Sequence, residues 1–89
     1  MEKSCDKHKK TVEKYDGDLK QLAEDIGDLH YDALQDFMLD LAVKLNKDSK
    51  ADEKRGRKQL STTLRRAGFN ISTAAMNIRE AWYISKPYM

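Results

Sequence analysis

The chain has 89 residues, of which 39% are hydrophobic and 36% are charged, and its formal net charge is +2. One small domain with a thin core is expected, because a chain of this length buries little more than ~60% of its unfolded surface, and no apolar run approaches the ~18–20 residues that would cross a bilayer. The single cysteine, Cys5, excludes an internal disulfide, and the basic N-terminus lacks the apolar stretch of a signal peptide, so we expect a cytoplasmic protein without a membrane partner.

Helical periodicity dominates the chain. One proline and four glycines leave few breaks, and few segments alternate with a period of two. We therefore expect an all-α fold, a small antiparallel bundle in one domain over residues 1–89, with four helices or with three helices after a frayed N-terminal one. The expected helices span approximately residues 5–26, 29–47, 50–67 and 71–85.

The first predicted helix carries an apolar seam with alternating steps of three and four residues. Its members are Val12, Tyr15, Leu19, Leu22, Ile26 and Leu29. Such a seam is typical of a helix packed lengthwise on another helix, so a homodimer through this first helix is one arrangement that the pattern permits. Gly17 lies inside the seam and costs up to ~1 kcal/mol relative to Ala, so the first turns are expected to fray.

Gly27 and Asp28 predict the end of this helix and the start of the next, as a C-cap glycine and an N-cap aspartate. The apolar face of the second helix comprises Leu34, Phe37, Met38, Leu41, Ala42 and Leu45. Asp32, Asp36 and Asp40 repeat every four residues beside it and form an acidic ridge. We expect this ridge to be a solvated surface rather than a metal site, because aspartates repeated every four residues more often form a solvated helix face, and a compact site would need a His or a further carboxylate beside them.

The polar run NKDSKAD, residues 46–52, predicts a turn in which Asp48 or Ser49 caps the third helix. Gly68 is expected to end that helix, with the ring of Phe69 packed back on the bundle.

The fourth predicted helix is capped by Asn70 or Ser72 and stopped by Pro87. Ile71, Ala74, Ala75, Ile78 and Trp82 form its apolar face. The two alanines permit a close approach to a neighbouring helix.

Charge is divided unevenly along the chain. Residues 1–45 hold 7 Lys+Arg against 11 Asp+Glu, net −4, and residues 46–89 hold 10 against 4, net +6. A helix over residues 50–67 would place a wide basic face beside an apolar edge that contains Leu60 and Leu64. Lysine and arginine neutralise phosphates, so this face is the candidate nucleic-acid-binding site. Its residues are Lys54, Arg55, Arg57, Lys58, Arg65 and Arg66.

The run KADEKRGRKQLS, Lys50 to Ser61, resembles the A-x-x-x-R-x-R-K-x-S/L segment of small bacterial linker-histone-like proteins. In those proteins a charged helical region is followed by R-x-R-K and a second helix, and the resemblance covers about 35 residues from Tyr31 to Ala67. It implies association with nucleic acid through Arg55, Arg57 and Lys58.

A second resemblance begins where the first ends. The pattern L-x-x-A-G-x-N-x-S-x-A-A-x-x-I, from Leu64 to Ile78, resembles the opening of a Fis-type helix-turn-helix. In that family a turn and a recognition helix follow, and the recognition helix enters the DNA major groove. Here nine residues remain beyond Glu80, and neither element has a counterpart.

No catalytic, metal or cofactor motif accompanies the basic face. Cys5 and His8 have C-x-x-H spacing, but no second ligand pair follows and His30 stands alone. The chain has no glycine loop of the phosphate-binding or dinucleotide-binding kind and no local nucleophile–His–carboxylate motif. We therefore expect a protein that is not an enzyme and needs no metal or cofactor.

Two functional hypotheses follow from these patterns. The first is a small non-enzymatic nucleic-acid-binding protein that contacts phosphates through the basic third helix. The alternative is a protein–protein interaction module of the immunity, antitoxin or adaptor kind, which would use its acidic and basic faces. The position of the acidic ridge discriminates between them, because an acidic ridge beside the basic face would repel phosphates.

Overall fold

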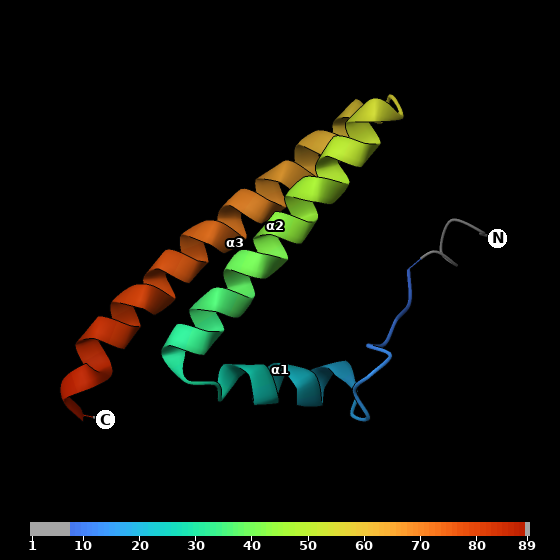
Figure 1. Ribbon diagram of the computed structural model, residues 1–89. Coiled ribbons are helices and arrows are strands. Elements are labelled where there is room, and N and C mark those ends of the chain that lie inside the picture. Colours follow the sequence, from blue (N-terminus) through green and yellow to red (C-terminus); the bar gives the residue numbers. More distant parts are fainter. Residues whose placement is uncertain (1–7, 89) are drawn as a thin grey trace.

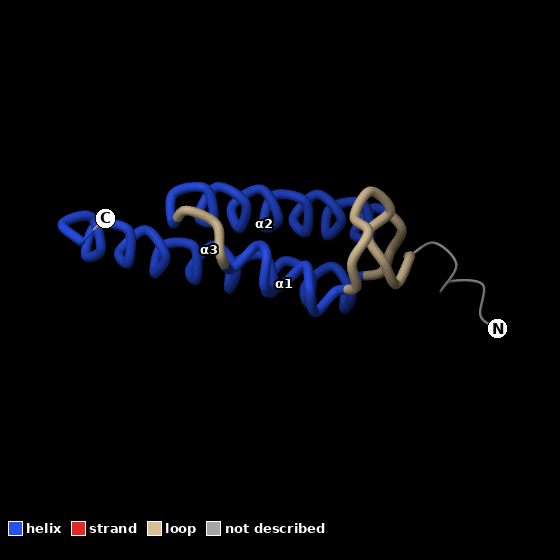
Figure 2. Tube along the Cα trace, turned by 90° about the horizontal axis from the view of Figure 1, so that it is seen from below, coloured by secondary structure: helices blue, strands red, loops and turns tan. Residues whose placement is uncertain are grey.

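The computed structural model describes residues 8–88 and shows an all-α protein with three α-helices. These are α1 (Leu19–Gly27), α2 (Tyr31–Lys54) and α3 (Lys58–Ser85), followed by a 3₁₀ turn, η2 (Lys86–Tyr88). In this range there is no strand. Helices α2 and α3 form an antiparallel hairpin, and α1 lies at its open end at a wide angle to both (Figure 1). Seen from below, α2 and α3 run side by side and α3 extends past the start of α2 (Figure 2).

The predicted helix boundaries are wrong in the second half of the chain. Residues 46–52, predicted to be a turn, lie inside α2, and the break predicted at Gly68 lies inside α3. Two long helices of 24 and 28 residues therefore replace three predicted shorter ones. The first helix is also shorter than predicted, since α1 begins at Leu19, and the predicted start at residue 5 falls outside the described residues. Pro87 is confirmed as the stop, because α3 ends two residues before it.

The chain reverses at Gly56, in the middle of the predicted basic helix. Gly56 has φ +79°, and no other residue in the described range has a positive φ. Its N–H donates to the Glu53 carbonyl at 3.0 Å and the Arg57 N–H donates to the Asp52 carbonyl at 2.9 Å. This pair of bonds is the Schellman arrangement, in which a glycine takes the left-handed position after the last helical turn.

The hairpin seam consists of small residues spaced seven apart. The seam residues are Ala42 and Ser49 on α2 and Ser61, Gly68 and Ala75 on α3, and all five are buried. A Cβ on Gly68 would lie 3.2 Å from the Ala42 carbonyl oxygen. The Ser49 hydroxyl lies 2.7 Å from the Ser61 carbonyl oxygen and 2.9 Å from the Ser61 hydroxyl. A repeat of seven keeps one stripe of each helix facing its neighbour, and small side chains on it let the two backbones approach closely.

This seam explains both erroneous breaks. Small and polar residues favour turns in isolation, but the same residues also suit the point of closest contact between helices. Gly68 costs α3 up to ~1 kcal/mol of helix propensity, which the close packing against Ala42 offsets. Ser49 is therefore a buried contact residue of α2 rather than the cap of a following helix.

Around α1 the capping differs from the prediction. Asp18 is the N-cap, and its carboxylate accepts a hydrogen bond from the Gln21 N–H at 2.8 Å. Gly27 keeps a negative φ and Asp28 follows it as the C-cap, so the predicted cap pair is wrong. His30 is the N-cap of α2 instead.

Two side-chain bonds hold the segments that flank α1. The Tyr15 hydroxyl donates to Asp25, and this hydrogen bond to a carboxylate raises the pKa of Tyr15 to about 12. The His30 Nδ1 lies 2.5 Å from the Asp32 carboxylate, which lowers the pKa of Asp32. The ring of His30 also meets the ring of Trp82 edge to face, with centroids 4.5 Å apart, and so ties the start of α2 to the end of α3.

The predicted apolar faces are only partly covered. Ala42 and Ala75 are the hydrophobic residues fully buried within residues 8–88, whereas Phe37 and Leu41 are each more than one third exposed. No helix in the described part of the chain combines the length and apolarity needed to cross a membrane.

Candidate nucleic-acid interface

Four of the six candidate residues gather at the hairpin tip. Lys54 is the last residue of α2, Arg55 and Arg57 flank Gly56 in the turn, and Lys58 is the first residue of α3. The sequence predicts that these residues share one face of a single helix. This prediction is wrong, because the turn at Gly56 divides residues 50–67 between α2 and α3. We call Lys54, Arg55, Arg57 and Lys58 the basic tip.

Asp52 fixes the two arginines of the basic tip. Its side chain is 11% exposed, and its Oδ1 lies 3.3 Å from Arg57 Nη1 and 3.7 Å from Arg55 Nη1. The arginine side chains themselves are more than half exposed, at 55% and 57%. Each guanidinium has five N–H donors, so one contact to Asp52 leaves most donors of each arginine facing solvent. The carboxylate therefore orients the arginines while their outer edges remain open to an anion.

The helix ends at the tip contribute little net field. The N-terminus of α3, which favours anions, lies beside the C-terminus of α2, which disfavours them. The N-cap of α3, Arg57, makes no side-chain cap bond. Between Lys50 and Lys58 five cations outnumber two carboxylates, for a net charge of +3. The side chains, rather than the helix dipoles, therefore determine the potential at the tip.

The other two candidate residues lie on α3, about two turns from the tip. Arg65 and Arg66 line a shallow hollow of about 300 Å³ with Thr62 and Phe69. The sequence predicts that Phe69 packs on the bundle, but its side chain is 70% exposed. The structure thus adds an exposed aromatic ring beside two arginines to the predicted site.

The acidic ridge lies far from the basic tip. Asp40 precedes Lys54 by 14 positions on α2, which corresponds to ~21 Å along the helix, and Asp32 precedes it by 22 positions, or ~33 Å. Residues 16–40 contain eight carboxylates and one lysine. The acidic residues 16–40 thus lie toward the open end of the hairpin and the basic tip lies at the turn; Figure 1 shows where these segments are placed.

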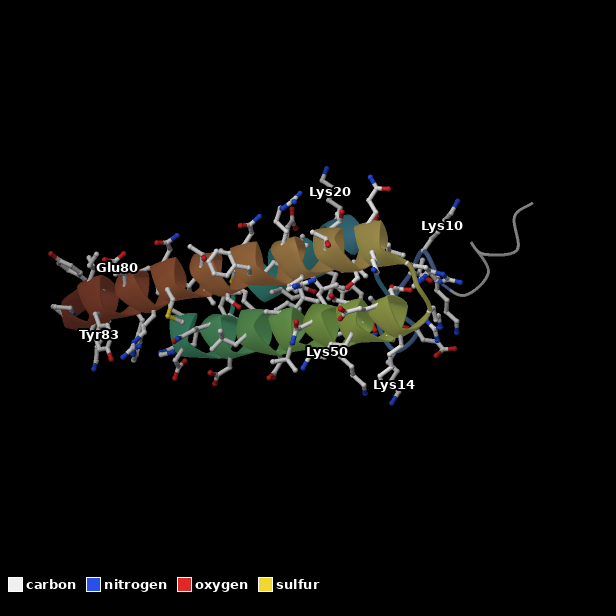
Figure 3. The ribbon with its side chains drawn as sticks, turned by 90° about the horizontal axis from the view of Figure 1, so that it is seen from above. Lys10, Lys14, Lys20, Lys50, Glu80 and Tyr83 are labelled. Carbon is white, nitrogen blue, oxygen red and sulfur yellow. The ribbon has the colours of Figure 1, made fainter. Side chains whose placement is uncertain are left out.

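The side chains of the hairpin that Figure 3 labels point away from the seam between α2 and α3. Figure 3 shows Lys50 projecting from α2, and Glu80 and Tyr83 projecting from α3 at the end opposite the turn. At that end Arg79 stacks on Tyr83, and Lys86 lies over the rings of Trp82 and Tyr83. These cations therefore belong to an aromatic cluster separate from the basic tip.

Sequence patterns missed Asp52 as the residue that organises the site. The signal was present as a carboxylate three residues before Arg55 and five before Arg57. This spacing indicates a contact between Asp52 and both arginines only when the chain is known to turn at Gly56. Within residues 8–88 no group of three His, Cys, Asp or Glu side chains is arranged to hold a metal ion, and Cys5 lies outside the described residues.

Comparison with family models, with curated proteins and with solved structures gives no match for this chain. The linker-histone-like and Fis-type resemblances therefore remain predictions from short motifs. Helix α3 runs continuously through Gly68 and Asn70, where the sequence predicts that one helix ends and the next begins.

Proposed function

We propose that this chain is a small, non-enzymatic, cytoplasmic protein that binds nucleic acid through phosphate contacts at the basic tip, with Arg65 and Arg66 extending the contact along α3. The observation that carries the proposal is the placement of four exposed cations within five residues at the turn, ~21 Å or more from the acidic ridge. Backbone contacts of this kind depend on charge and carry no sequence information, so binding is expected to be largely non-specific.

The proposal is tested by fluorescence anisotropy with a labelled duplex of about 25 base pairs across a salt series. We expect the triple substitution Arg55→Ala, Arg57→Ala and Lys58→Ala to weaken binding to all duplexes alike. The slope of log K against log salt should become shallower by about 1 for each phosphate that the variant no longer neutralises. A single-stranded RNA and a single-stranded DNA of the same length show which nucleic acid is preferred.

A matched control removes three cations far from the tip, through Lys20→Ala, Arg79→Ala and Lys86→Ala. The net charge changes equally in the two triple variants, so a difference between them reports position rather than total charge. Equal weakening by both variants, or no binding by the parent protein near 50 mM salt, would contradict the proposal.

Replacement of Asp52 by Asn should have opposite effects on binding and on stability. The amide keeps the shape but loses the charge, so the hairpin should lose about 1–2 kcal/mol of unfolding free energy. Arg55 and Arg57, no longer neutralised, should bind duplex several-fold more tightly. Urea titration followed by circular dichroism and the same anisotropy assay measure the two effects, with Glu80→Gln as a control of equal charge change at the far end of α3.

The alternative function, a protein–protein interaction module, is supported by a different observation. Val43 and Phe69 are 66% and 70% exposed, although large apolar side chains of soluble proteins are mostly covered. Absence of duplex binding together with an intact fold would favour this alternative.

A further inference from the structure

The molecule is one layer of helices. Its principal extents are 50 × 29 × 14 Å, and the smallest is close to the ~10–12 Å diameter of a single helix with its side chains. Its accessible surface is 7384 Å², against ~5,400 Å² for a compact monomer of this mass. Stable domains pack two layers around one core. A second layer must therefore come from outside the hairpin.

One side of the hairpin is open and apolar. Leu39 and Val43 of α2 and Phe69 of α3 line a groove of about 360 Å³, which we call the Phe69 face. The lining of this groove comes from α2 and α3 and includes none of the described residues before them. Helix α1 therefore does not cover the Phe69 face.

The α2 edge of the Phe69 face is self-complementary. Residues at alternating steps of four and three share one stripe of a helix. On this stripe lie, in order, Asp32, Asp36, Leu39, Val43, Asn46 and Lys50. A second α2 laid antiparallel on it brings Leu39 against Val43 of the second copy and Asp32 against Lys50 of the second copy. In this arrangement the acidic end of each stripe contacts the basic end of the other, and the apolar centres of the two stripes contact each other.

Helix α3 fits the same symmetry axis. Ala42 faces Gly68 across the hairpin seam. Because α2 and α3 are antiparallel, one step back along α2, at Leu41, is level with one step forward along α3, at Phe69. Leu41 is also the midpoint between Leu39 and Val43 along α2. A twofold axis that pairs Leu39 with Val43 of the second copy therefore also brings the two Phe69 rings face to face.

We propose that a second copy of this chain occupies the Phe69 face and forms an antiparallel, twofold-symmetric dimer with a four-helix core. The proposal commits to α2 and α3 as the interface, rather than to the first helix that the sequence pattern permits. A twofold interface uses the same patch on both subunits, which a self-complementary stripe satisfies. The two basic tips then lie at opposite ends of the dimer, so duplex binding at the tips is separable from dimerisation, whereas Arg65 lines the Phe69 face and is shared by the two surfaces.

The test measures the dimer dissociation constant by sedimentation equilibrium, with mass from light scattering. The parent chain should have twice its mass of 10.3 kDa. Val43→Asp should give a folded monomer, whereas Ile84→Asp should leave the dimer intact. Ile84 is as exposed as Val43, at 69%, but it follows Phe69 by 15 positions on α3, which places it ~22 Å along the helix from the proposed axis.

Charge reversal tests the register. Asp32→Lys and Lys50→Asp should each raise the dissociation constant at least about tenfold, because each creates two like-charge pairs across the dimer. The double variant should restore the parent value. The two residues lie 18 positions apart on α2, or ~27 Å, so a rescue within one chain is impossible.

Disulfide trapping gives a second measurement that does not depend on the charge variants. In a Cys5→Ser background, Phe69→Cys should oxidise rapidly to a covalent dimer, because the two positions face each other across the axis. Asn70→Cys should not form a covalent dimer, because position 70 is turned by ~100° from position 69 around the helix. A monomeric parent chain, a dimer unaffected by Val43→Asp, or a double charge reversal that fails to rescue would each overturn the proposal.

Discussion

Replacing Gly68 by Leu should lower the unfolding free energy by about 3 kcal/mol, the upper end of what overpacking costs. A Cβ at this position would already lie 3.2 Å from the Ala42 carbonyl oxygen and 3.7 Å from the Leu45 side chain. Backbone atoms cannot yield as the end of a flexible side chain can. A leucine therefore forces α2 and α3 apart over the contact that forms the centre of the seam. Urea titration followed by circular dichroism at a fixed protein concentration measures the loss.

Two further glycine variants separate packing from backbone effects. Gly68→Ala gains up to ~1 kcal/mol of helix propensity but still meets the Ala42 carbonyl, so we expect a net loss smaller than for leucine. Gly27→Ala is the matched control, since Gly27 is also a helical glycine without a positive φ, but a Cβ there would meet nothing within 4 Å. It should change stability by less than ~1 kcal/mol. If Gly68→Leu were as stable as the parent, the close seam between α2 and α3 would be wrong.

Replacing Ser49 by Ala should cost about 1–2 kcal/mol, because the Ser61 hydroxyl is then buried without its side-chain partner. The two hydroxyls are 2.9 Å apart, and both residues are fully buried. The double variant Ser49→Ala, Ser61→Ala should cost less than the sum of the two single changes, because it removes both members of the pair and leaves two small apolar residues in a seam already built from such residues. Thermal and urea unfolding of the four proteins complete the cycle.

The control for this cycle is Thr63→Ala. The Thr63 hydroxyl bonds to the Gln59 carbonyl at 2.9 Å within the same helix and is exposed to solvent. Its loss should change stability by no more than ~0.5 kcal/mol. Strictly additive single changes at Ser49 and Ser61 would mean that the two hydroxyls do not interact.

The candidate site was only partly predictable from sequence. The cations of the basic tip stand out in any charge count, and the structure keeps them exposed. Their arrangement was not predictable, because the turn that gathers them depends on Gly56 alone. Gly27, Gly56 and Gly68 look alike in sequence: local patterns predict a helix end at Gly27 and at Gly68 and leave Gly56 inside a helix, whereas the chain reverses at Gly56 and α3 continues through Gly68. Only the packing partner distinguishes a glycine that reverses the chain from one that lets two helices touch.

The sequence by itself determined the helical class, the stop at Pro87 and the division into an acidic and a basic half. These properties follow from local periodicity, proline chemistry and composition, which need no distant contact. The tertiary structure alone decided where the helices break, that Asp52 holds Arg55 and Arg57, and that the ring of Phe69 faces solvent. The continuity of α2 and α3 depends on the pairing of Ala42 with Gly68 and Ser49 with Ser61, contacts between residues 12 or more positions apart that no local pattern encodes. The contacts of Asp52 depend on the turn at Gly56.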